Sequence, residues 1–149
     1  MSVWILPTCV RKNNDYYYEL DKALDTLKTI FWAQSRPITN IEVGDIVYIY
    51  EGLPIQAIGW KCKVLAVKAS YEESKTIDDS AFEHGHSEPT NFYIKITAIG
   101  KYDDEARAKL SYAKLCENGL KYKMQGPFRP KGQPLVYINS VKPSVLYND

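Results

Sequence analysis

The sequence has few cysteines, few histidines and almost no net charge, and each shortage removes a class of function. Its three cysteines, Cys9, Cys62 and Cys116, are odd in number and far apart, so neither a disulfide framework nor a structural zinc site is expected. Reduced thiols and a cytoplasmic location are predicted instead. The 19 basic and 18 acidic residues nearly cancel, which excludes the strong positive field that drives non-specific DNA binding.

Long hydrophobic runs are absent as well. The first apolar run, residues 4–6, stops at Pro7 and is too short for a signal peptide. No later run is long enough to cross a membrane, so no membrane contact is expected. The 149 residues are predicted to form one domain, 1–149, that buries its own core.

The sequence carries no recognisable catalytic or metal-binding motif. His84 and His86 form the only histidine pair, and they lie in an acidic loop without a nearby cysteine or a carboxylate motif of suitable spacing. No phosphate-binding glycine loop and no nucleophile with an evident base is present. We therefore expect a binding protein rather than an enzyme, with no metal and no other cofactor.

Aromatic and β-branched residues in strand-like runs are abundant. Twelve tyrosines and three tryptophans favour a β-rich fold. Strands are predicted at 2–7, 46–50, 57–68, 92–99 and 135–138, with Trp4 in the core. Helices are predicted from 14 or 15 to 28 and from 111 to 119, with a polar excursion at 70–91 and a tail at 141–149. This mixture predicts an α+β fold.

The segment 31–64 is typical of a ligand pocket. It places two strands around a loop in which Trp32 is followed by an amide, a hydroxyl and a guanidinium, and Pro37 keeps that loop from becoming helical. An aromatic plane beside several donors suits a flat, polar ligand, although an indole sealing the core is an alternative for Trp32. The pattern leaves open which strand aromatics accompany it. The candidate pocket residues are Trp32, Ser35, Tyr48, Tyr50 and Trp60.

One stretch, residues 121–131, is locally positive. It reads KYKMQGPFRPK and interleaves four basic residues with two aromatics and two prolines. A loop of this kind suits contact with phosphates and a groove, whereas a merely soluble surface is the alternative. The candidate contacts to a nucleic-acid backbone are Arg36, Lys121, Lys123, Gln125, Arg129 and Lys131.

The order of these motifs resembles the EVE-like domains of the PUA superfamily, relatives of the YTH readers of methylated adenine. The similar features are Trp32 just after the first helix, the pair Gly44-Asp45 before the run 47–50, and the apolar strand 58–67. The late helix ending at Gly119 and the motif at 125–129 are similar to EVE-like domains attached to bacterial restriction and nuclease proteins. The resemblance implies a small, twisted, partly open β-barrel flanked by two or three helices, with an aromatic cage for a modified base.

These observations lead to one hypothesis and two alternatives. The hypothesis is a non-catalytic module that recognises a methylated or hydroxymethylated base, such as 5-methylcytosine or N6-methyladenine, flipped out of DNA, on behalf of a nuclease or motor partner. The alternatives are a reader of modified RNA and a sensor of a small molecule or nucleotide that uses the same pocket. Salt dependence separates a polymer from a neutral small ligand, because phosphate contacts release counterions.

Overall fold

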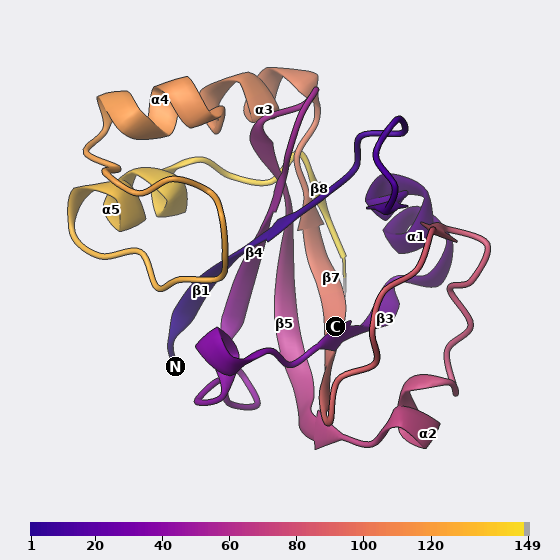
Figure 1. Ribbon diagram of the computed structural model, residues 1–149. Helices are drawn as coiled ribbons and strands as arrows, with labels where there is room; N and C mark the ends of the chain where they lie inside the picture. The colour runs from indigo at the N-terminus through magenta and orange to yellow at the C-terminus, as the bar shows by residue number, and fades with distance from the viewer. Residues whose placement is uncertain (148–149) are drawn as a thin grey trace.

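The computed structural model describes residues 1–147 and confirms the predicted α+β fold (Figure 1). The main sheet has the order β1-β4-β5-β7-β3, with β8 beside β7. Its strands are β1 (Val3–Thr8), β3 (Thr29–Ala33), β4 (Ile46–Glu51), β5 (Ala57–Ala69), β7 (Tyr93–Lys101) and β8 (Val145–Leu146). A separate two-stranded ribbon pairs β2 (Tyr17–Tyr18) with β6 (Glu83–His84).

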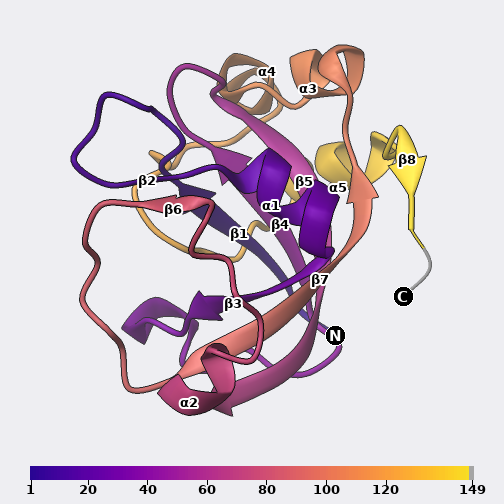
Figure 2. The ribbon, with the colours of Figure 1, turned by 90° about the vertical axis from the view of Figure 1, so that its right-hand side faces the viewer.

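Short helices connect and cover these strands. They are α1 (Leu20–Leu27), α2 (Tyr71–Ser74), α3 (Asp104–Lys109), α4 (Tyr112–Glu117) and α5 (Gln133–Ser140), with a 3-10 turn η1 (Arg36–Ile38). Figures 1 and 2 show α3, α4 and α5 gathered on one side of the sheet, while α1 and α2 lie on the other. Within residues 1–147, no helix has the length and apolarity needed to cross a bilayer.

The sheet is twisted and remains open between its two edge strands. β1 runs parallel to β4, and every other pair in this sheet is antiparallel. The edge strands β1 and β3 do not pair with each other in the described part of the chain. This arrangement agrees with the partly open barrel that the resemblance implies.

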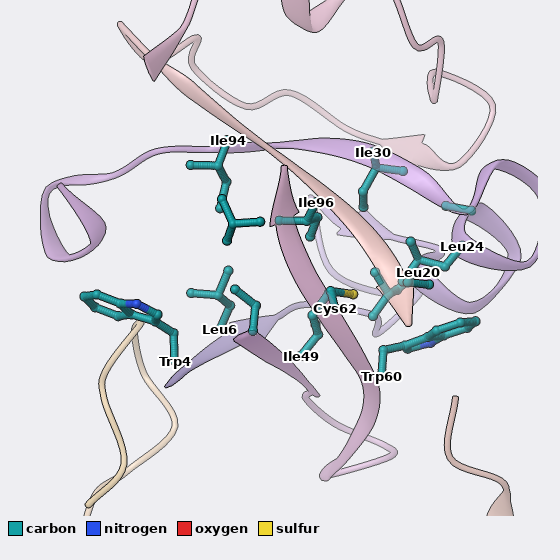
Figure 3. Packing of buried hydrophobic residues seen from close by; sticks show 14 of the residues in the cluster. Trp4, Leu6, Leu20, Leu24, Ile30, Ile49, Trp60, Cys62, Ile94 and Ile96 are labelled. Carbon is teal, nitrogen blue, oxygen red and sulfur yellow. The ribbon is translucent and has the colours of Figure 1, made fainter. Parts of the chain in front are cut away.

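The central strand β4 is buried on both faces, which explains its uninterrupted apolar run. Val47 and Ile49 point into a cluster enclosed by the sheet and α1, whereas Tyr48 and Tyr50 point into a second cluster beneath α3, α4 and α5. Figure 3 shows the first cluster, with Trp4 and Trp60 at its two ends. The predicted core position of Trp4 is confirmed, since its side chain is almost fully buried.

Asp45, which reads as a simple turn residue in the sequence, ties the start of the chain to β4. Its carboxylate accepts hydrogen bonds from the backbone N–H of Ser2 at 2.8 Å and of Glu42 at 2.9 Å, and from Trp4 Nε1 at 3.0 Å. The side chain is buried, with 3% of its surface exposed. A buried carboxylate with three donors fixes the turn before β4 and the path of β1 together.

One predicted element is wrong, and another begins later than predicted. Residues 135–138 form part of α5 rather than a strand, because the helix begins after Gly132 with Pro134 in its first turn and buries Ile138 against the second cluster. The first helix begins at Leu20 rather than at 14 or 15, because Tyr17 and Tyr18 pair with β6 instead. The short helix capped by Ser111 is confirmed: the Ser111 hydroxyl accepts from Lys114 N at 3.2 Å.

The predicted tail at 141–149 is also wrong wherever the structure describes it. Residues 145–146 pair with β7, and the Tyr147 ring stacks on Trp60 with centroids 6.3 Å apart. Residues 148 and 149 of the predicted tail lie outside the described part of the chain. The C-terminal segment therefore covers the end of the sheet on which Trp60 lies.

Candidate binding site

A cavity of about 400 Å³ lies at the open side of the sheet. Residues 7–9 of the β1 end form one wall and residues 31–33 of β3 form another, so both edge strands contribute. The remaining walls come from the β2–β6 ribbon, α2 and the polar excursion that connects β5 to β7. We call this cavity the edge pocket, and its volume lies in the range of small-ligand sites.

Aromatic rings dominate one part of the edge pocket. Trp32 is half-buried on β3, and Tyr18 meets it edge to face with centroids 6.4 Å apart. Tyr71, at the start of α2, is exposed and lies 6.3 Å from the ring of Tyr93 on β7. Exposed aromatic faces beside a cavity provide stacking surfaces for a planar ligand.

Carboxylates line another part of the edge pocket, and two of them accept hydrogen bonds from tyrosines. The Tyr18 hydroxyl donates to Asp79 Oδ2 at 2.7 Å, and the Tyr16 hydroxyl donates to Glu83 Oε2 at 2.8 Å. Burial raises the pKa of Tyr16 and of Tyr18, so both phenols keep their protons. Burial also raises the pKa of Asp79, against the lowering effect of the Tyr18 hydroxyl. Each carboxylate has further lone pairs, so it can also accept from N–H groups of a ligand.

Backbone groups of β3 also face the open edge. Ala98 N donates to Lys28 O and Gln34 N donates to Phe92 O, so even-numbered residues of this segment bond to β7. By the alternation of an antiparallel pair, the backbone N–H and C=O groups of Phe31 and Ala33 point the other way. The wall formed by β3 therefore offers both donors and acceptors in addition to the Trp32 ring.

The structure does not bring the predicted partners of Trp32 into the edge pocket. Tyr48 lies in the second core cluster, where its hydroxyl donates to Asn139 at 3.0 Å, and Trp60 lies in the first cluster, where its indole N–H donates to Asp21 at 2.7 Å. Tyr50 is 4% exposed and packs edge to face against Tyr112. None of these three lines the edge pocket, because β4 and β5 are central strands of the sheet, although Tyr50 lines a neighbouring cavity.

Ser35 and Arg36 lie just beyond the edge pocket. Ser35 precedes η1, and Arg36 begins it with an exposed side chain. Neither residue contributes to the wall, since the chain turns away from the pocket after Ala33. Of the predicted pocket residues, Trp32 alone lines this cavity.

The basic segment 121–131 lies against β1 rather than at the edge pocket. The backbone of Phe128 exchanges two hydrogen bonds with Ile5, at 2.8 and 3.1 Å, and its ring packs on the second core cluster instead of projecting as a wedge. Arg129 donates to Ser2 Oγ at 2.9 Å and lies over the Trp4 ring. The remaining predicted backbone contacts in this segment are exposed: Lys121, Lys123, Gln125 and Lys131.

The two histidines have separate partners. His84 stacks on Tyr17, with centroids 4.5 Å apart, and its Nε2 lies 2.9 Å from Glu19, whereas His86 lies beside Glu88. Across residues 1–147, no three acidic, cysteine or histidine side chains are grouped to hold a metal ion. His84 therefore has a structural role in the β2–β6 ribbon.

Sequence reasoning missed most of the edge pocket. Tyr16, Tyr71, Asp79, Glu83 and Tyr93 come from a loop, a one-turn helix and strand ends, which show no apolar period. The available signal was the number of tyrosines next to the polar excursion. Ser70 caps α2 with a capping box, a further sign that this excursion has a defined structure.

Comparisons with known proteins place the fold. No protein-family model and no curated protein matches the sequence. ASCH from Zymomonas mobilis is similar in structure with a TM-score of 0.58 at 12% identity, covering 95% of this chain and 96% of that chain. A hypothetical protein from Leishmania major has a TM-score of 0.61 at 14% identity, covering 94% of this chain and 93% of that chain. A protein from Rhodopseudomonas palustris has a TM-score of 0.57 at 9% identity, covering 95% of this chain and 93% of that chain. The chain thus shares the fold of these three proteins.

Proposed function

We propose that this chain is a non-catalytic nucleic-acid-binding module that accepts one extruded base in the edge pocket. The observation that carries the proposal is the edge pocket itself, where the Trp32 ring, tyrosine-bonded carboxylates and strand-edge backbone groups surround one cavity. Its assignment to the EVE-like domains, and a modified base in DNA as its ligand, belong to the same proposal. Both are supported by the motifs in the sequence and by the shared PUA-like fold.

The charge of the edge pocket favours a base over a phosphate. Asp79, Glu83 and Glu88 contribute three carboxylates to its walls, and Lys75 contributes the one ammonium group among its lining residues. Carboxylates repel phosphate but accept hydrogen bonds from exocyclic amino groups, such as cytosine N4 and adenine N6. We therefore expect derivatives of cytosine or adenine to bind, with their phosphates outside the pocket.

The energetics allow selectivity for a modified base. Extruding a base costs a few kcal/mol, while stacking on an aromatic ring contributes about 1–3 kcal/mol per base. A methyl group that fills apolar space adds about 0.8 kcal/mol, which corresponds to about fourfold in affinity. Hydrogen bonds from the edge of the base to the carboxylates and to the backbone of Phe31 and Ala33 must supply the remaining binding free energy.

The proposal is tested by fluorescence polarisation with matched oligonucleotides. The probes carry one plain, N6-methylated, 5-methylated or 5-hydroxymethylated base, as single strand and duplex, in DNA and RNA, at two salt concentrations. We expect one modification to be preferred, and Trp32→Leu to reduce that affinity about 5-fold to 150-fold through loss of stacking. Thermal melting of the variant checks that it folds. Equal binding of plain and modified probes by the wild type and by Trp32→Leu would contradict the proposal.

A small-molecule sensor is the second candidate, and the acidic walls of the edge pocket favour it if the ligand carries an amine. Such a ligand would use Asp79 and Glu83 without any polymer. Its binding would depend little on salt, whereas binding through phosphates falls steeply as salt rises. The two salt concentrations of the same assay therefore separate the candidates.

A further inference from the structure

A second cavity of about 330 Å³ lies directly beside the edge pocket. The same three residues at the end of β1, Pro7, Thr8 and Cys9, line both cavities. On the far side of this shared wall, the second cavity is bounded by Arg11, Asn14 and Gln125. A chain-like ligand that places one unit in the edge pocket would therefore pass over the end of β1 to reach the second cavity.

The two cavities differ in charge. Carboxylates line the edge pocket, whereas the residues of the described range 1–147 that line the second cavity include one arginine and two amides and no acidic side chain. The two loops beside it, 9–14 and 121–131, contain six lysines or arginines and no aspartate or glutamate. An uncharged base fits the first environment, and a phosphate with its nucleotide fits the second.

Both loops are held in place against β1. Asn14 Nδ2 lies 2.8 Å from Cys9 Sγ, and Asn14 N donates to Arg11 O at 3.1 Å, which closes a turn. On the other side, the hydrogen bonds between Ile5 and Phe128 attach the segment that carries Gln125. The spacing between the two cavities is thus set by the strand rather than by free side chains.

We propose that the second cavity binds the nucleotide next to the extruded base, with its phosphate on Arg11 and its base or sugar against Gln125. This inference rests on the proposed function, because it assumes that the edge pocket holds a base. It adds a second subsite and therefore a preference for the neighbouring nucleotide. The β1–β2 loop becomes a nucleic-acid contact that the sequence pattern did not indicate.

The test uses 12-nucleotide single strands with a central 5-methylcytosine or N6-methyladenine, in DNA and RNA, and the same strands with an abasic centre. The double variant Arg11→Gln/Gln125→Ala should bind the preferred probe on the order of tenfold more weakly. It should also reduce the slope of log affinity against log salt by about 0.7, the contribution of one phosphate on a single strand. The double variant should lose affinity by the same factor for the abasic probe, because that probe leaves the edge pocket empty and changes nothing in the second cavity. Lys142→Gln, an exposed change outside both cavities, is the matched control.

The results separate the inference from the proposed function. If Trp32→Leu weakens binding but the double variant behaves like Lys142→Gln, the second subsite is wrong and the base pocket stands. If Trp32→Leu binds every probe as the wild type does, the base pocket is wrong and the inference falls with it. A loss in the double variant that depends on the central base would also overturn the inference, because the two cavities would then not be separate subsites.

Discussion

Glu51, at the end of β4, provides the sharpest test of the electrostatic reasoning. Its carboxyl group is 1% exposed, and Oε2 lies 2.7 Å from Arg107 Nη1. Arg107 also donates to both oxygens of Asp21, at 3.0 and 3.2 Å. Burial, together with the negative charge of Asp21, raises the pKa of Glu51 to about 8 in spite of the arginine. We therefore expect the folded protein to hold a proton on Glu51 at neutral pH.

This proton makes stability depend on pH in a defined direction. Below pH 4.5, the usual pKa, Glu51 is protonated in both states and its full contribution to stability is present. As pH rises toward about 8, the unfolded chain ionises Glu51 while the folded chain does not, so folding loses up to about 1.4 kcal/mol per pH unit. Over the whole window the loss is on the order of 4–5 kcal/mol. The amide of Glu51→Gln imitates the protonated carboxyl group and cannot ionise. The variant should therefore not show this loss of stability with rising pH.

The measurement is urea denaturation of the wild type and Glu51→Gln at pH 4, 5, 6, 7, 8 and 9. We expect similar stabilities at pH 4 and a widening advantage for the variant, reaching several kcal/mol at pH 9. Glu105→Gln, which removes a carboxyl group at an exposed position on α3, is the matched control. A difference for Glu51→Gln that does not change with pH would refute the raised pKa of Glu51.

Three further predictions follow from other contacts. Asp45→Asn should lower the free energy of unfolding by about 1–3 kcal/mol in urea, since an amide cannot accept from all three of its donors; an unchanged midpoint would contradict this. Asp79→Asn should weaken the preferred modified-base probe about tenfold by removing a charged acceptor, without changing the salt slope; full affinity would show that this carboxylate does not read the ligand. In a Cys116→Ser background, alkylation of half-buried Cys9 by N-ethylmaleimide should slow when the 12-nucleotide probe is bound, because Cys9 lies in the wall between the cavities; an unchanged rate would place the probe elsewhere.

The strands of the main sheet could be predicted because their local pattern and their burial agree. The run 46–50 and the strand 57–68 appear where expected, as β4 and β5. The failure at 135–138 has a physical cause: Leu135 to Ile138 favour a strand by composition, but packing against the second core cluster decides in favour of a helix. Propensity over four residues is too weak to resist that tertiary contact.

Of the residues that line the edge pocket, the sequence predicted only Trp32 as part of the candidate site. Trp32 was identified because it follows a recognisable helix and precedes a proline-containing loop, and both are local signals. The burial of Tyr48 and Trp60 depends on which strands become central in the sheet. The order of strands is set by long-range pairing, which no local sequence pattern predicts. The carboxylates at 79 and 83 reach the edge pocket through the β2–β6 pairing, a contact between residues more than sixty positions apart.

The open side of the sheet has a consequence for how this fold can change. If β1 and β3 paired, they would use their backbone groups on each other and leave no pocket. Because they do not pair, the excursion between β5 and β7 closes the gap from outside without contributing to most of the core. If the edge pocket binds a ligand as proposed, substitutions at the exposed Tyr71 should alter ligand binding while the sheet keeps its stability. Under the proposed function, ligand choice and folding would depend on different parts of this chain.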